Sequence, residues 1–163
     1  MPASAGKADT PLTLTVVSDR EIVLTRTFDA PRSLVFKTMT DPALIPKWWG
    51  PRGSTTIVDK MDVRPGGEWR YIHNMANGGQ TGFRGVYREV TPPERLVYTF
   101  EWDGMPGHVQ TETITFEERN GKTTLVNRVR FDSVEDRDGM LKSGMEKGAT
   151  ETMDRLAELL AQE

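Results

Sequence analysis

Cysteine is absent from this chain of 163 residues, and only two histidines are present. Without cysteine there can be no disulfide bond, no thiolate nucleophile and no cysteine-ligated metal site. His73 and His108 lie too far apart in the sequence for a metal-ligand spacing, and no Ser-His-Asp set can be recognised. We therefore expect neither a metal nor another cofactor, and the composition fits a reducing compartment such as the cytoplasm.

An excess of positive charge is also missing, because 24 acidic residues outnumber 21 basic ones. The net charge of −3 provides no field that would gather phosphate backbones, so we expect no nucleic-acid partner. No apolar run approaches the roughly 20 residues that cross a bilayer, and a membrane role is not expected. We predict a cytoplasmic protein with a flexible tail over residues 1–12 and a single domain over residues 13–163.

Two adjacent tryptophans are the most distinctive local feature, in the segment DPALIPKWWGP at residues 41–51. Asp41 is suited to cap a short helix that begins at the following proline, and Gly50 is suited to end it. The segment therefore brings Trp48 and Trp49 to one place beside an apolar interior. We predict that Trp48 packs against the sheet and that Trp49 borders the mouth of an internal cavity.

Hydrophobic periodicity indicates one strand, two short helices and then a meander of strands. β-branched residues alternate over residues 13–29, and a helix is predicted to start near Pro31, before the segment 41–51. Asn-Gly and Pro-rich turns divide the following region. The runs between these turns predict six antiparallel strands at roughly 54–63, 67–76, 81–90, 95–103, 108–118 and 123–132.

After residue 132 the period changes to that of a helix. Ser133, followed by Asp136 three positions later, is typical of a helix start, and apolar residues then recur at steps of three and four. The pattern predicts one long amphipathic helix of about 25 residues. Only a helix lying across the concave face of a strongly curved sheet would bury both apolar surfaces.

Five motifs in this order resemble the SRPBCC superfamily, which is also called START-like or birch-pollen-allergen-like. They are FDAPRSLVF, DPALIPKWWGP, DVRPGGEWRY, GVYREVTPPERLVYTF and GMEKGATETMDRLAELL. Within the superfamily they are similar to the heat-shock protein 90 ATPase activator homologues, from about residue 18 onward. The resemblance implies an α+β helix-grip fold, in which a curved antiparallel sheet of about six or seven strands encloses a hydrophobic cavity with a long C-terminal helix. Its members include lipid carriers, polyketide cyclases, co-chaperone domains and stress proteins, so the fold does not select a function.

Strand alternation predicts which side chains face that cavity, because the bulky face of each strand is expected to point inward. The expected ligand-binding residues are Trp49, Trp69, Tyr71, His73, Phe83, Tyr87, Tyr98, Phe100, Trp102, Glu112, Ile114, Asn127, Val129, Met145, Ala149 and Met153.

Three of these inward side chains are polar, namely His73, Glu112 and Asn127. Buried polar groups are costly unless they are hydrogen-bonded, so they are either paired structural groups or groups that orient a ligand. In the structural interpretation, His73 and Glu112 lie near strand ends or bond to each other or to tyrosine hydroxyls, and no ligand is involved. If Glu112 were unpaired, it would be the first candidate for a general acid or base, with His73 as the second candidate.

The predicted helix contains Gly144 and Gly148, which cost about 1 kcal/mol each relative to alanine in a helix interior. They either allow close packing, for example on Gly85, or leave volume for a ligand. Relatives often carry a tryptophan after the second glycine, whereas this chain has Ala149, which would enlarge the cavity.

Three functions remain open at this stage. The favoured one is binding of a small hydrophobic or amphipathic molecule in the cavity. The second is a co-chaperone-like interaction with a chaperone partner, and the third is a cyclase or dehydratase that uses the same cavity. Because no catalytic constellation is evident, we expect a binding protein rather than an enzyme. The oligomeric state cannot be read from these patterns.

Overall fold

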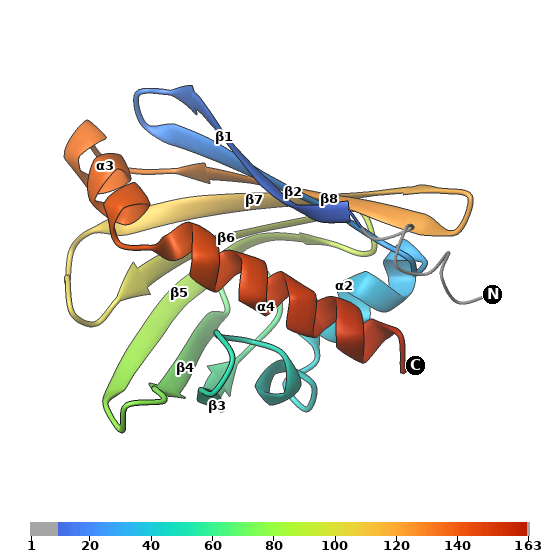
Figure 1. Ribbon diagram of the computed structural model, residues 1–163, viewed down its shortest axis with the longest axis horizontal. Helices are drawn as coiled ribbons and strands as arrows, with labels where there is room; N and C mark the ends of the chain where they lie inside the picture. The colour runs from blue at the N-terminus through green and yellow to red at the C-terminus, as the bar shows by residue number, and fades with distance from the viewer. Residues whose placement is uncertain (1–9, 163) are drawn as a thin grey trace.

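A single curved sheet of eight antiparallel strands forms the body of the computed structural model, which describes residues 10–162 (Figure 1). The strand order is β1-β2-β8-β7-β6-β5-β4-β3, so the β2–β8 pair joins the N-terminal hairpin to the last strand of the meander. The strands are β1 (Thr10–Ser18), β2 (Glu21–Phe28), β3 (Thr55–Met61), β4 (Glu68–Asn74), β5 (Gln80–Thr91), β6 (Arg95–Trp102), β7 (Val109–Arg119) and β8 (Lys122–Arg130).

Helices cover one side of this sheet, and the longest of them crosses in front of it in Figure 1. They are α2 (Arg32–Thr40), the short 3-10 helix η1 (Ile45–Lys47), α3 (Val134–Lys142) and α4 (Met145–Leu160). The architecture is the predicted α+β helix-grip fold. No helix within the described part of the chain is both long and apolar enough to cross a membrane.

The six predicted meander strands are confirmed, each with ends within two residues of the expected ones. Their turns have the expected chemistry: Asn120 and Gly121 adopt positive φ angles of 55° and 77° between β7 and β8. Two consecutive positive φ angles give the turn whose twist matches that of the flanking strands.

The strand predicted over residues 13–29 is wrong as a single element, because the chain turns back after Ser18 and forms β1 and β2. Ser18 pairs with Glu21, so only two residues make the turn. No glycine or proline marks that turn in the sequence, which explains both the missed hairpin and the higher strand count. Residues 10–12 belong to β1 rather than to the predicted tail, whose residues 1–9 lie outside the described residues.

The single long C-terminal helix is also wrong, because it is divided into α3 and α4 at Ser143 and Gly144. The predicted start is confirmed: the backbone N–H of Asp136 donates to Ser133 Oγ over 3.0 Å. Gly144, however, adopts a left-handed conformation with φ of 85°, which an α-helix cannot contain. The chain therefore bends between the two helices.

Apolar packing is concentrated under the C-terminal half of α4. Its side chains Leu156, Leu159 and Leu160 are buried, and they belong to a cluster that includes residues of α2, η1 and the sheet. A second cluster lies under α3 and the start of α4, where Met140 and Met145 pack on β2 and β8. Between these clusters, in its N-terminal part, α4 carries the small residues Gly148 and Ala149.

The division of the helix predicts opposite effects for two equivalent substitutions. Gly144→Ala should lower the free energy of unfolding by about 1 kcal/mol, because alanine is strained at positive φ. Gly148→Ala should raise it by about 0.5–1 kcal/mol, because Gly148 lies within α4 and a Cβ there would meet nothing within 4 Å. Urea denaturation followed by circular dichroism measures both values, and two stabilising substitutions would instead indicate a continuous helix.

Candidate binding cavity

A cavity of about 710 Å³ lies between the concave face of the sheet and α4. All of the side chains predicted above to bind a ligand line it, although they come from the η1 segment, five strands and α4. The wall is mostly aromatic and aliphatic. It also contains residues that strand alternation did not single out, among them Gln110, Met75 and Met105 and the α3 residues Glu135 and Asp136.

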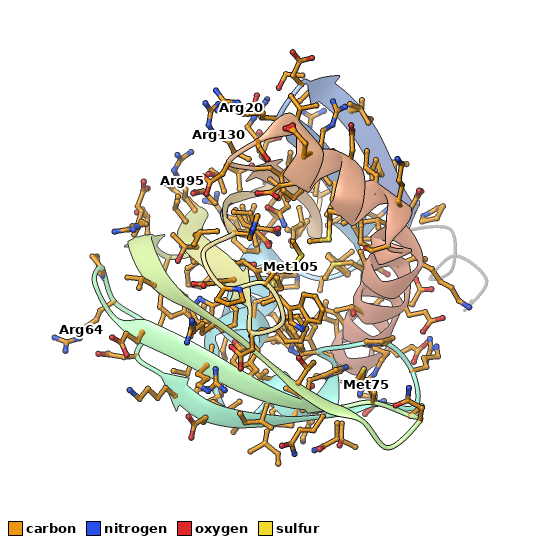
Figure 2. The ribbon with its side chains drawn as sticks, turned by 90° about the vertical axis from the view of Figure 1, so that its left-hand side faces the viewer. Arg20, Arg64, Met75, Arg95, Met105 and Arg130 are labelled. Carbon is orange, nitrogen blue, oxygen red and sulfur yellow. The ribbon has the colours of Figure 1, made fainter. Side chains whose placement is uncertain are left out.

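One end of the cavity opens to solvent. The exposed side chains of its wall are Met75 after β4, Trp102 at the end of β6, and Met105 in the following loop, with exposed fractions of 39%, 40% and 45%. Figure 2 looks onto this end and labels both methionines. Across the opening, His108 Nδ1 lies 2.7 Å from Asp136 Oδ1, which joins the start of β7 to α3. The mouth is thus bounded by turns of the meander and by α3.

The two tryptophans of the 41–51 segment occupy different environments. Trp48 is buried in the core cluster, and its Nε1–H donates to the carbonyl oxygen of Thr38 over 3.2 Å. Trp49 lines the cavity, where its ring makes edge-to-face contacts with Tyr71 and Phe83 at centroid distances of 5.1 and 5.2 Å. These aromatic contacts give the wall a defined shape.

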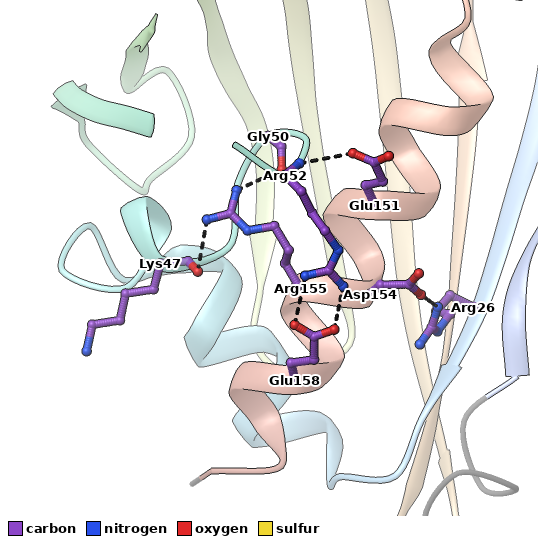
Figure 3. A network of polar contacts seen from close by, with 8 residues as sticks. All are labelled: Arg26, Lys47, Gly50, Arg52, Glu151, Asp154, Arg155 and Glu158. Carbon is purple, nitrogen blue, oxygen red and sulfur yellow. Dashed lines mark hydrogen bonds and ion pairs between the residues drawn. The ribbon is translucent and has the colours of Figure 1, made fainter. Parts of the chain in front are cut away.

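A polar network fastens the Trp49 segment to α4 (Figure 3). Arg155 of α4 donates to the carbonyl oxygen of Gly50 over 2.9 Å and to that of Lys47 over 3.3 Å. The backbone N–H of Arg52 donates to Glu151 over 3.0 Å, and the Arg52 guanidinium pairs with Glu158. A planar guanidinium suits several carbonyl oxygens at once, so Arg155 holds this segment, and with it Trp49, against the helix.

Glu112 is buried in the cavity wall, with 8% of its surface exposed, and both of its oxygens accept hydrogen bonds. Its Oε1 accepts hydrogen bonds from Tyr98 Oη and Asn127 Nδ2, both over 2.9 Å, and its Oε2 accepts one from Gln110 Nε2 over 3.0 Å. The register explains this cluster, because Tyr98 stands directly opposite Glu112 on β6 and β7. Burial, reinforced by the Glu112 carboxylate, raises the pKa of Tyr98 well above its ordinary value, so its hydroxyl remains a donor.

These hydrogen bonds bear on the two interpretations of Glu112. The carboxylate is paired with a tyrosine hydroxyl, which is one of the arrangements of the structural interpretation, and it is therefore not the unpaired group that would favour acid–base chemistry. Asn127, in contrast to Glu112, is only partly hydrogen-bonded. Its amide N–H is used by Glu112, but its buried Oδ1 has no hydrogen-bond partner among residues 10–162. One acceptor in the cavity wall is therefore unsatisfied.

His73 is nearly buried beside Trp49 and Gly50. Thr56 Oγ1 donates to the carbonyl oxygen of Trp49 over 2.9 Å and lies 3.3 Å from His73 Nδ1. Because the hydroxyl proton is used for Trp49, this network assigns the proton of neutral His73 to Nδ1. Gly50, with φ of 99°, is required here because a Cβ would lie 2.5 Å from His73 Cε1. Burial, and then the charge of Arg155, lowers the pKa of His73.

No group of three or more His, Asp or Glu side chains within residues 10–162 could hold a metal ion.

Of the two interpretations of the helix glycines, the structure favours the one in which Gly148 leaves volume in the cavity. A Cβ at Gly148 would meet nothing within 4 Å, so close packing does not account for it, and Gly148 lines the cavity instead.

The lowered pKa of His73 predicts a measurable pH dependence of stability. The unfolded chain takes up a proton at His73 below about pH 6.5, whereas the folded chain resists it, so the free energy of unfolding falls as the pH drops below that value. His73→Phe preserves the ring packing and removes this titration. Urea denaturation at about pH 7 and about pH 5 should therefore show a smaller loss for His73→Phe than for the wild type. His108→Gln is the control for removing a histidine, and an unchanged loss in His73→Phe would contradict the assignment.

Solved structures with the same fold come from several bacteria. A crystal structure from Rhodobacter sphaeroides has a TM-score of 0.88 at 25% identity and covers 94% of this chain and 100% of that protein. One from Chromobacterium violaceum has a TM-score of 0.78 at 27% identity, covering 88% and 98%. The AHSA1 protein of Silicibacter pomeroyi has a TM-score of 0.73 at 25% identity, covering 87% and 98%.

A curated relative, an uncharacterized protein of Schizosaccharomyces pombe, is 28% identical over 111 residues, which are 68% of this chain and 29% of the relative. The chain therefore spans less than a third of that relative. Residues 29–161 match the family described as Activator of Hsp90 ATPase homolog 1-like protein, from the start of α2 to the end of α4. This chain belongs to the family of Activator of Hsp90 ATPase homolog 1-like proteins, within the SRPBCC superfamily.

Proposed function

We propose that the protein binds a small hydrophobic or amphipathic molecule in the cavity between the sheet and α4. The observation that carries this proposal is the cavity itself, with its volume of about 710 Å³ and its mostly aromatic and aliphatic wall. Ligand pockets are commonly about 300–1,000 Å³ in volume and combine apolar walls with a few polar groups. The Glu112 cluster supplies those polar groups.

The side chains of α4 support an interior that is left open for a ligand. At the point where the helix crosses the cavity it carries Gly148 and Ala149, although larger apolar residues would fill the space. An empty apolar cavity costs about 24 cal/mol per Å³ in core substitutions, so a ligand that fills it should stabilise the fold. Met145 and Met153 are flexible and can adapt to the shape of such a ligand.

The alternative functions have less support than binding. Catalysis would need a free acid or base, whereas both oxygens of Glu112 accept hydrogen bonds. Chaperone binding, suggested by the family description, would need a continuous apolar patch. Away from the cavity mouth, the large exposed apolar side chains of the described chain are Val16 and Val17 on β1, Ile57 on β3 and Val134 on α3, and β1 and β3 lie at opposite edges of the sheet.

Filling the cavity from α4 tests the proposal. Wild-type protein should bind the neutral dye Nile red saturably and with increased fluorescence, because the dye leaves water for an apolar site. Ala149→Trp places an indole in the same space, and we expect it to weaken binding at least about tenfold. Fluorescence titration measures the affinity, and circular dichroism verifies that the fold is retained.

Lys147→Trp is the matched control, because it adds the same side chain to an exposed position of α4 outside the cavity wall. Nile red should bind this variant with wild-type affinity. If Ala149→Trp folds and binds the dye as tightly as the wild type does, the cavity is not the binding site and the proposal fails.

A further inference from the structure

The described cavity lining contains carboxylates but no Lys or Arg. Glu112, Glu135 and Asp136 line the cavity together with His73 and His108, and of these carboxylates Asp136 is paired with His108. The chain has 21 Lys and Arg residues, so their exclusion is not a matter of composition. In Figure 2, Arg64 and Arg95 lie at the periphery and project away from the middle of the view, where Met105 lies beside the cavity mouth.

We propose that the ligand is an organic cation, an amine or ammonium group attached to an apolar body, and that Glu112 selects for its charge. This inference rests on the proposed binding function and adds the chemical class of the ligand. The central observation is that the three donors to Glu112, namely Tyr98, Gln110 and Asn127, are all neutral. Buried carboxylates are normally paired with a cation or a metal, and this one has a cavity beside it instead.

Glu112 and Asn127 each retain an acceptor position that no described residue occupies. A carboxylate offers about four lone-pair sites, and three of those on Glu112 are occupied, because Oε2 accepts only from Gln110. Asn127, whose Nδ2 is bonded to Glu112, lines the cavity and retains a buried Oδ1 without a partner among the described residues. An ammonium group carries only donors and no acceptors, so it complements this pair of acceptors.

The aromatic wall favours a cation further. The ring of Trp69 lies 5.9 Å from that of Tyr98, the Glu112 donor, and 5.8 Å from that of Phe100. Aromatic faces attract ammonium groups, and the attraction strengthens in a site shielded from water. A ligand carboxylate would gain none of this, since it would place a second negative charge beside Glu112 and would find no Lys or Arg partner in the lining.

Three ligands with the same chain and different head groups test the charge preference in wild-type protein. Decylamine, decanol and decanoate are titrated against bound Nile red at neutral pH. We expect decylamine to bind at least about tenfold more tightly than decanol, because its ammonium group adds a charge–charge attraction to Glu112 that a neutral hydroxyl lacks, and decanoate to bind most weakly. Decanol or decanoate binding as tightly as decylamine would overturn the inference while leaving the binding function intact. If neither Nile red nor any of the three ligands binds, the proposed function itself fails.

Glu112→Gln assigns the preference to this carboxylate. The glutamine oxygen can still accept from Tyr98 and Asn127, so the fold should persist while the charge is lost. Decylamine affinity should fall about tenfold toward that of decanol, and decanol affinity should fall much less, because decanol carries no charge. Glu117→Gln is the matched control, because Glu117 lies on the same strand but is exposed and outside the cavity wall.

Retention of the full amine preference in folded Glu112→Gln would overturn the assignment. If that variant does not fold, the ranking of the three ligands in the wild-type protein decides the inference.

Discussion

The concave face of the sheet is larger than α4 can fill, and this mismatch determines most of the structure. Near its C-terminal end the helix packs tightly, because Leu156, Leu159 and Leu160 are buried against the core. Near its N-terminal end it presents Gly148 and Ala149, and the space they leave becomes the cavity. The dense end supplies stability while the hollow end remains available for binding. One helix thus serves both purposes through the order of its side chains.

The hollow end keeps its shape because polar contacts hold the parts that apolar packing does not. Arg155 ties the segment containing Trp49 to α4 through backbone carbonyl groups, so the aromatic wall does not depend on a filled interior. The Glu112 cluster does the same between β6, β7 and β8. A buried carboxylate with neutral donors and no basic neighbour in the cavity lining carries an electrostatic asymmetry, and a cationic ligand would compensate for it.

Local chemistry was sufficient to predict the meander and the inward faces of its strands, since Asn-Gly turns and alternation each report on nearby residues only. It failed at the β1–β2 turn, because Asp19 favours turns but is not followed by the glycine that marks a two-residue hairpin. It also failed at Gly144, because the same sequence pattern fits a continuous helix and a bent one. A tyrosine hydroxyl was one of the partners considered for Glu112, but its identity as Tyr98 and the bonds from Gln110 and Asn127 could not be predicted, because they require the register between strands. The cavity volume likewise depends on how closely the helix approaches the sheet, which no local pattern encodes.

A crystal structure of the protein with bound decylamine tests the central claim most directly. We predict that the alkyl chain lies between α4 and the concave face of the sheet, and that the ammonium nitrogen lies within hydrogen-bond distance of Glu112 Oε2 and Asn127 Oδ1. A cavity collapsed by rearranged side chains, or an amine located only on the outer surface, would contradict the account.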